Sequence, residues 1–177
     1  MSLTYYKDLT FHFYAEYSGT PGVWHNAQLS SQDTVKVCFT PPAGCGQLIV
    51  EEIGKAKKSI YVQAYSLTSA IIVDGLIRAH SSGVDVNVLV DKSNLKDSFS
   101  KMKNLKKAGI KVAVDHVVGI AHNKVMIIDR KRVITGSFNF SHAADYKNAE
   151  NVVLIDNSTM ASAFLESWFT RHSNALL

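Results

Sequence analysis

The chain has 177 residues, of which 46% are hydrophobic and 19% are charged, so it can form one globular domain with a sizeable core. This composition excludes a disordered or coiled-coil protein. The formal net charge of +4 and the isoelectric point near 9.0 favour polyanionic partners, such as nucleic acid or an anionic lipid surface. Many ordinary enzymes share so mild a bias, and the charge alone therefore decides nothing.

Residues 1–33 are the least regular part of the sequence, and we predict that they form an N-terminal extension. Thr10–Tyr14 is strand-like, and Ser18–Gly22 is typical of a turn. No basic region followed by an apolar stretch is visible at the N-terminus, and no apolar run is long enough to predict a membrane-spanning helix. A periplasmic or secreted location is expected only if a leader has been removed and the two cysteines are bridged.

Those cysteines, Cys38 and Cys45, flank a turn that contains two prolines. Such a turn can bring two Cβ atoms together, so a local disulfide and a pair of reduced thiols are equally compatible with the spacing. A structural zinc site is disfavoured, because a cysteine pair needs two further ligands and no C-x-x-C or paired-histidine motif accompanies it.

From residue 34 onward, strand-like and helix-like segments alternate, which is typical of β-α-β units. The last third differs, because two strands joined by a short turn at residues 129–131 favour a hairpin. We therefore predict an α/β fold for residues 34–177, with a mixed, largely parallel β-sheet sandwiched between α-helices. The expected strands are 34–39, 59–65, 84–90, 111–115, 123–129, 132–135 and 151–155, and the expected helices include 48–56, 71–77, a lysine-rich helix over 95–108 and a terminal helix over 160–168.

The most informative stretch pairs a histidine with a lysine two residues later. His122 and Lys124 lie in a segment with the apolar pattern of a strand. Side chains two positions apart in a strand share a face, so these two are expected to project together while Val125 and Ile127 enter the opposite layer. By the same parity Asp129 lies on the other face, and we expect it to be a buried group that holds the strand and turn.

A second polar pair with the same spacing follows at Ser137 and Asn139, directly after Gly136, whose missing Cβ permits close approach to the backbone. If the two pairs converge, their chemistry suits a phosphodiester. Lys124 can neutralise its charge, while Ser137 and the Asn139 amide bind its non-bridging oxygens. An imidazole near neutrality can attack phosphorus or transfer a proton, so His122 is the candidate nucleophile.

These residues resemble a known family. The pattern H-x-K-x-x-x-x-D followed by G-S-x-N is the signature of the phospholipase D superfamily, and from about Val35 to the C-terminus the order of elements is similar to that of its small bacterial endonuclease. The matching residues are His122, Lys124, Asp129, Gly136, Ser137 and Asn139.

The resemblance implies a mechanism. One His122 attacks phosphorus to form a phosphohistidine, while a second histidine protonates the leaving oxygen. Larger relatives carry two motifs in one chain, whereas this chain carries one, so the resemblance implies a homodimer. It also implies that Glu150 accepts a hydrogen bond from the nucleophile, although a glutamate before a strand is often only a surface residue. No metal or other cofactor is expected.

Two substrate classes remain open at this point. Nucleic acid is favoured by the basic balance and by lysines that could follow a phosphate backbone; these are Lys92, Lys96, Lys101, Lys103, Lys106, Lys107 and Lys111. The alternative is a phospholipase D-type lipid phosphodiesterase at an anionic lipid surface, which requires an exposed apolar entry surface. Trp24, Tyr65 and Phe138 are candidates for stacking on bases, with core packing favoured for Tyr65 and Phe138.

Overall fold

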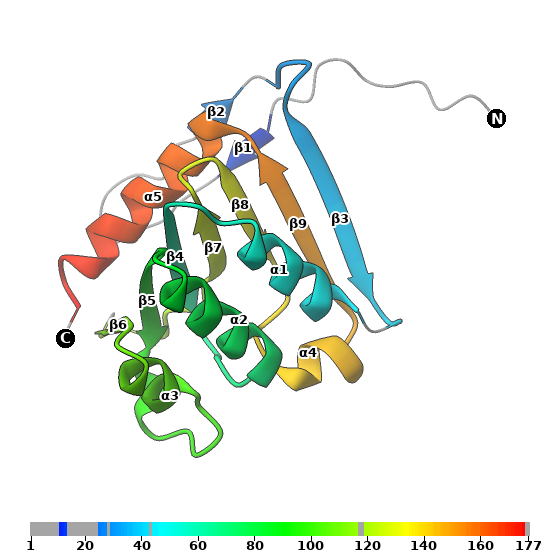
Figure 1. The fold of residues 1–177 in the computed structure, drawn as a ribbon. Coiled ribbons are helices and arrows are strands. Elements are labelled where there is room, and N and C mark those ends of the chain that lie inside the picture. Colours follow the sequence, from blue (N-terminus) through cyan, green and yellow to red (C-terminus); the bar gives the residue numbers. More distant parts are fainter. Residues whose placement is uncertain (1–10, 14–24, 28, 43, 117–118, 176–177) are drawn as a thin grey trace.

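A computed structural model describes residues 11–13, 25–27, 29–42, 44–116 and 119–175 (Figure 1). In chain order its elements are β1 (Phe11–Phe13), β2 (His25–Ala27), β3 (Thr34–Thr40), α1 (Cys45–Gly54), β4 (Ser59–Ala64), α2 (Ala70–Ser81), β5 (Asp85–Asp91), the 3₁₀ turn η1 (Lys92–Leu95), α3 (Met102–Lys107), β6 (Lys111–Asp115), β7 (Lys124–Ile128), β8 (Arg132–Gly136), α4 (His142–Tyr146), β9 (Glu150–Asp156) and α5 (Ser158–His172).

Seven strands form one mixed sheet in the order β3-β9-β8-β7-β4-β5-β6. The expected mixed sheet between helices is confirmed, but the expectation that it is largely parallel is wrong. Only β4, β5 and β6 pair in parallel, whereas all other neighbours are antiparallel. For β7 and β8 the reason is the length of the connection: a parallel crossover needs a dozen or more residues, and this link has only three.

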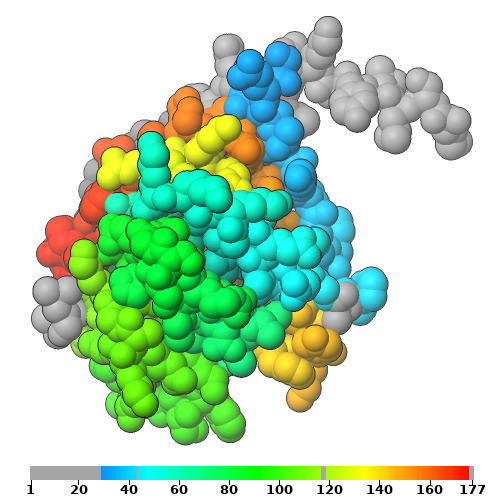
Figure 2. Space-filling model, viewed as in Figure 1, coloured from blue at the N-terminus to red at the C-terminus, as the bar shows by residue number. Residues whose placement is uncertain are grey.

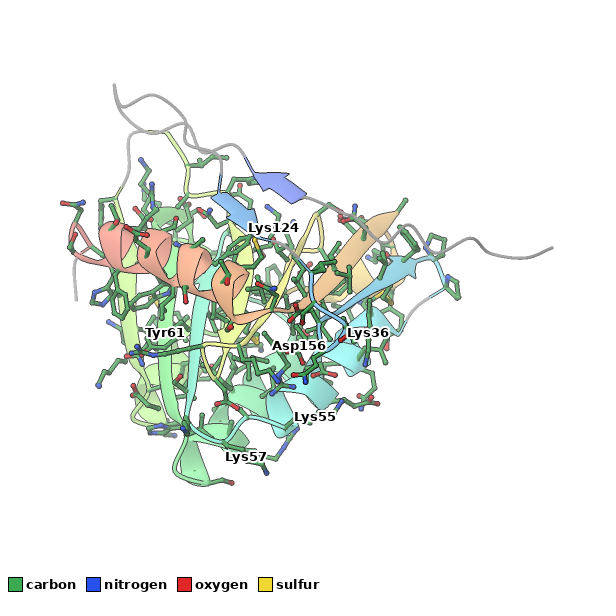
Figure 3. All side chains as sticks on the ribbon, turned by 90° about the horizontal axis from the view of Figure 1, so that it is seen from above. Lys36, Lys55, Lys57, Tyr61, Lys124 and Asp156 are labelled. Carbon is green, nitrogen blue, oxygen red and sulfur yellow. A yellow bond between two sulfur atoms is a disulfide. The ribbon has the colours of Figure 1, made fainter. Side chains whose placement is uncertain are left out.

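Helices cover both faces of this sheet, as the views in Figures 1 and 3 show. Helices α1, α2 and α3 pack on one face, which Figure 2 shows as a continuous layer, and the buried side chains beneath them include Ile60 and Val62. Helix α5 covers the other face through Trp168, whose indole nitrogen donates to the Val62 carbonyl at 3.0 Å. An apolar layer therefore covers each face of the sheet, and polar residues that form a site can gather at the ends of the strands.

The expected lysine-rich helix over residues 95–108 is wrong in its first half. Only Met102–Lys107 is α-helical, and it is preceded by a loop. Short polar side chains compete for the backbone there: Asp97 Oδ1 accepts from the Phe99 N–H at 2.8 Å, and Ser100 Oγ donates to Asn94 Oδ1 at 3.0 Å. These local hydrogen bonds favour a closed loop over a helical turn.

The N-terminal extension contributes the antiparallel pair β1 and β2, and β1 falls within the strand-like stretch Thr10–Tyr14. The expected turn at Ser18–Gly22 and the candidate stacking residue Trp24 lie outside the described residues. The boundary between residues 33 and 34 stays a prediction. Among the helices described, none combines the length and apolarity that a bilayer crossing requires.

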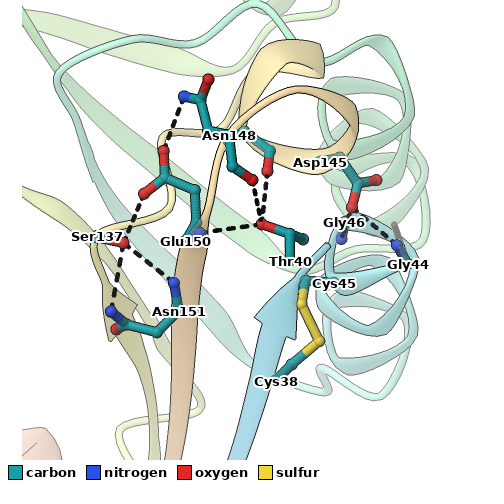
Figure 4. The surroundings of a disulfide bond; sticks show 11 residues. Cys38, Thr40, Gly44, Cys45, Gly46, Ser137, Asp145, Asn148, Glu150 and Asn151 are labelled. Atoms are coloured by element: carbon teal, nitrogen blue, oxygen red, sulfur yellow. Dashed lines mark hydrogen bonds between the residues drawn. A yellow bond between two sulfur atoms is a disulfide. The ribbon is translucent and has the colours of Figure 1, made fainter. Parts of the chain in front are cut away.

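Cys38 and Cys45 form a disulfide that joins β3 to the first residue of α1, with Cα atoms 5.8 Å apart (Figure 4). This resolves the question that the spacing left open. Replacing both cysteines with alanine is expected to lower the free energy of unfolding by about 2 kcal/mol, because the bridge restricts the unfolded chain. Denaturant unfolding of the variant, the oxidised wild-type protein and the reduced wild-type protein measures the difference. Equal midpoints for all three samples contradict the prediction.

Candidate active site

Two motif segments lie on either side of one connection at the end of the sheet. The connection follows β4: the Tyr65 N–H donates to the Asn123 carbonyl at 2.9 Å, and the Thr68 and Ser69 N–H groups both donate to the Phe140 carbonyl at 2.9 Å. The histidine segment and the Ser137–Phe140 segment are thus held by backbone hydrogen bonds to the same short stretch of chain. Residues distant in sequence are thus brought to the same end of the inner strands β4 and β7.

The structure brings His122 and Lys124 together with an aromatic ring. The Lys124 ammonium donates to the His122 carbonyl at 2.8 Å and lies 5.2 Å from the centre of the Tyr65 ring. The Tyr65 and His122 rings are 4.5 Å apart. Unlike the expectation, His122 precedes the strand, which begins at Lys124; its side chain is exposed, whereas Lys124 is only 7% exposed. As expected, Val125 and Ile127 enter the opposite layer, beneath α5.

These surroundings favour the neutral form of the His122 imidazole. Partial burial lowers the pKa of His122 below its usual 6.5, the Lys124 cation lowers it further, and the Asp91 carboxylate opposes both. Burial also lowers the pKa of Lys124, and the Glu150 carboxylate acts in the opposite direction. A neutral ring that reaches solvent and is held beside a cation can act as a nucleophile towards an anionic substrate.

Glu150 lies at the centre of a hydrogen-bond network at the start of β9 (Figure 4). Its carboxylate accepts from the Ser137 hydroxyl at 2.5 Å and from the Asn148 amide at 2.9 Å. The Glu150 N–H donates to Thr40 Oγ1 at 3.1 Å, and that hydroxyl in turn donates to the Ala144 and Asn148 carbonyls. The carboxylate is therefore fixed on two sides, and Ser137 is engaged by Glu150 in this chain.

Asn139 follows two residues after Ser137 and is half-buried. Its Oδ1 atom is buried and finds no hydrogen-bond donor among the described residues. The amide NH₂ is the end of this side chain that can donate to a phosphate oxygen. A buried polar atom without a partner costs free energy, and such atoms persist where function requires the side chain to stay in place.

Gly136 has a backbone conformation and surroundings that favour glycine over other residues. Its φ is 143°, and a Cβ there would lie 2.3 Å from the Asn151 carbonyl oxygen of β9. Gly136→Ala is therefore expected to lower the free energy of unfolding by about 2–4 kcal/mol, from backbone strain and overpacking together. Thermal unfolding measures the loss. Gly54→Ala, where the added Cβ meets nothing within 4 Å, is the control; equal melting temperatures for the two variants contradict the prediction.

Asp129 lies at the opposite end of β7, in the turn that leads to β8. Asp129 and Arg130 both have positive φ, and the Lys131 N–H closes the turn onto the Ile128 carbonyl. The Asp129 carboxylate accepts from the N–H groups of residues 57–59, which lead into β4. Asp129 thus holds the strand and turn, but it follows the strand and is half-buried, where the sequence favoured a buried strand position.

Sequence reasoning undervalued Tyr65 and did not name Asn148 or Asp91. Tyr65 follows β4, whose Ala64 pairs with Lys124, so a neighbouring strand places the ring beside the motif. The available signal was an aromatic residue just after a buried strand. Phe138 is buried in the core, as favoured. Within the described ranges, no three His, Cys, Asp or Glu side chains gather closely enough to hold a metal ion.

Comparison with known proteins identifies the family. Residues 49–173 match a family model described as the phospholipase D-like domain of cardiolipin synthase. The chain belongs to the phospholipase D superfamily. It is 46% identical to a phospholipase D of Rickettsia prowazekii, over 99% of this chain and 89% of that protein, and 53% identical to a phospholipase D of Rickettsia typhi, over 81% and 71%.

A solved structure agrees with this assignment. The phospholipase D family member Nuc from Salmonella typhimurium superposes with a TM-score of 0.77 and 35% identity, over 81% of this chain and 97% of that one. The resemblance drawn from the sequence motif is thus confirmed, and so is the class of fold. As a member of the superfamily, the protein is a phosphodiester hydrolase.

Proposed function

We propose that the protein is a metal-independent nuclease that cleaves DNA or RNA through a phosphohistidine formed on His122, at a site shared by two copies of the chain. The observation that supports this most directly is that the exposed His122 imidazole and the buried Lys124 ammonium both lie against the Tyr65 ring. The ring supplies a nucleophile, and the cation supplies a fixed positive charge for the phosphate.

The reaction proceeds in two displacements. A ring nitrogen of His122 attacks phosphorus, the bond from phosphorus to the leaving oxygen breaks, and a second, protonated histidine donates its proton to that oxygen. Water then attacks the phosphohistidine, the second histidine accepts a proton from the water, and His122 leaves as a neutral imidazole. Lys124 and Asn139 bind the non-bridging oxygens throughout, because the negative charge on them persists in both transition states.

A second copy of the chain supplies the second histidine. The motif occurs once in the sequence. Within this chain the Glu150 carboxylate is bound by Ser137 and Asn148, while the exposed His122 ring contacts Tyr65. We infer a twofold axis beside the site. It brings His122 of the partner subunit towards Glu150, and it brings the two histidine rings towards one phosphate.

Glu150→Gln is expected to reduce turnover more than tenfold while the fold and dimer persist. The amide keeps the shape of the side chain but loses the charge that stabilises an imidazolium across the interface. Circular dichroism, size-exclusion chromatography and kcat measure the three properties. Glu166→Gln, an exposed position on α5, is the control. An unfolded Glu150→Gln protein assigns Glu150 a structural role instead.

Nucleic acid is the substrate that the charge distribution favours. The lysines predicted to follow a phosphate backbone lie on the segment from η1 to the start of β6, and most of them are exposed. That segment is tied to the site, because the Asn94 amide donates to the Tyr65 carbonyl at 2.7 Å. Binding through such a row of cations weakens steeply with salt concentration.

A lipid phosphodiester is the second candidate, and one observation favours it. The loop closed by Asn94 and Ser100 exposes Leu95 and Phe99, which are 55% and 76% exposed. Apolar side chains among lysines are typical of surfaces that touch anionic membranes. The rickettsial relatives named phospholipase D point the same way.

One experiment separates the candidates. The protein is incubated in excess chelator with single-stranded DNA, duplex DNA, RNA, and vesicles of phosphatidylcholine or cardiolipin. Cleavage of nucleic acid that disappears in His122→Ala supports the nuclease, whereas release of a headgroup alone supports the lipid enzyme. Binding of nucleic acid without turnover of any substrate contradicts both.

A further inference from the structure

A buried carboxylate outside the motif lies behind the histidine segment. Asp91, the last residue of β5, is 1% exposed. Its two oxygens accept from two backbone groups: Oδ1 from the Ser93 N–H at 2.8 Å, and Oδ2 from the Ala121 N–H at 2.7 Å. Each oxygen therefore has a defined partner, and the two partners come from segments separated by nearly thirty positions in the sequence.

The carboxylate keeps its charge in spite of its burial. Burial favours the neutral acid, but the hydrogen bonds from Ser93 and Ala121 and the nearby Lys92 cation outweigh it and hold the pKa of Asp91 below its usual range. At neutral pH a fixed negative charge thus lies next to the segment that carries His122. Its cost is tolerated because both oxygens are hydrogen-bonded.

The Ala121 contact matters because His122 lies outside any regular element. Residues 119–123 form neither helix nor strand, so no ladder of hydrogen bonds orients the ring. Besides the hydrogen bond from the Lys124 ammonium to the His122 carbonyl, contacts on both sides of His122 hold the segment. The Ala121 N–H is bound by Asp91 on one side of His122, and the Asn123 carbonyl accepts from the Tyr65 N–H on the other.

We propose that Asp91 is a positioning residue for His122, holding the backbone that delivers the ring to phosphorus and placing a negative charge behind that ring. This assignment rests on the proposed function, in which His122 is the nucleophile. Asp91 touches no reacting atom and acts through the Ala121 N–H and through the electrostatic field at the imidazole. Nucleophiles displaced by about 1 Å lose on the order of a hundredfold in rate, so such a contact has a large effect.

The charges that face His122 set the direction in which its pKa shifts, and the pH profile of activity reports that pKa. Lys124 on β7 lowers the pKa of the ring, and Asp91 at the end of β5 raises it. Asp115, at the end of β6, lines the same small space as Asp91 but is paired with Arg171 of α5 at 2.5 Å. Removal of the Asp91 charge destabilises the protonated imidazole, so the pKa of His122 falls.

Asp91→Asn tests the proposal, because asparagine has the same shape but no charge and cannot accept both hydrogen bonds. We expect kcat to fall about 10- to 100-fold, the limb of the kcat/KM profile set by His122 to move to lower pH, and an NMR titration of the His122 ring to shift in the same direction. Asp129→Asn is the matched control, since that carboxylate also accepts backbone N–H groups but lies at the far end of β7. It is expected to lose stability and keep the wild-type pH profile.

The outcomes distinguish this inference from the proposed function. If His122→Ala retains activity, His122 is not the nucleophile, and the proposed function itself is overturned. If His122→Ala is inactive while Asp91→Asn keeps wild-type turnover and His122 titration, only the positioning role is overturned. Should Asp91→Asn fail to fold, Asp91→Glu retains the charge while moving the carboxylate. It is then expected to lose turnover with little change in the titration of His122, and wild-type turnover in that variant overturns the proposal.

Discussion

His122→Ala is expected to reduce phosphodiester hydrolysis at least about a thousandfold, because the variant loses the atom that forms the covalent intermediate. The fold should persist, since the ring is exposed and lies against the Tyr65 ring at the surface. The measurement is the initial rate on the best substrate of the chelator panel, with unfolding curves to verify stability. His172→Ala is the control. It removes a histidine from the last turn of α5, outside the site, and it is expected to keep the wild-type rate.

Mixing the two proteins tests whether the site is shared. When equal amounts of wild-type and His122→Ala chains exchange freely, about one quarter of the dimers carry two intact imidazoles, whereas independent subunits would retain about half of the activity. The expected activity is therefore close to one quarter of that of the same total amount of wild-type protein. A value near one half, or full turnover in a strictly monomeric preparation, contradicts a site built from two chains.

The sequence predicts the site motif well because the relevant constraints are local. The pair His122 and Lys124 can be read from a single short stretch of sequence, and the short separation of β7 and β8 makes a hairpin the simplest connection. The requirement for glycine at Gly136 is local in part: its positive φ belongs to the chain itself, whereas the close approach of the Asn151 carbonyl depends on β9.

What the sequence does not predict depends on which strands become neighbours. Tyr65 reaches Lys124 because β4 pairs with β7, and Asp91 reaches Ala121 because β5 lies next to β4. No periodicity in one segment encodes the order of strands in a sheet. The same limitation explains why too much of the sheet was expected to be parallel. The alternation of strands and helices predicts parallel pairing, but in the structure only β4, β5 and β6 pair in this way.

Lys124→Met is expected to reduce turnover more than about a hundredfold, because a preorganised cation in a site of low exposure stabilises developing charge far better than water does. Methionine has nearly the same shape, so the change removes the charge without leaving a cavity. Asn139→Ala, which removes the amide donor, is expected to lose a similar factor. Near-normal rates in both variants contradict the assignment of a phosphate clamp to these two residues.

Lys124→Met is expected to affect stability in the opposite direction from activity. Burial lowers the pKa of Lys124, which means that the folded state disfavours its charged form relative to the unfolded chain at any pH below the folded pKa. Removing the charge relieves that cost, so Lys124→Met should unfold at the same or a higher temperature than the wild type even as it loses activity. A lysine with a purely structural role predicts the reverse, because its hydrogen bond to the His122 carbonyl and its contact with the Tyr65 ring would then be net stabilising. The combination of lost turnover and retained stability thus distinguishes a cation held in place for its substrate from one that serves the fold.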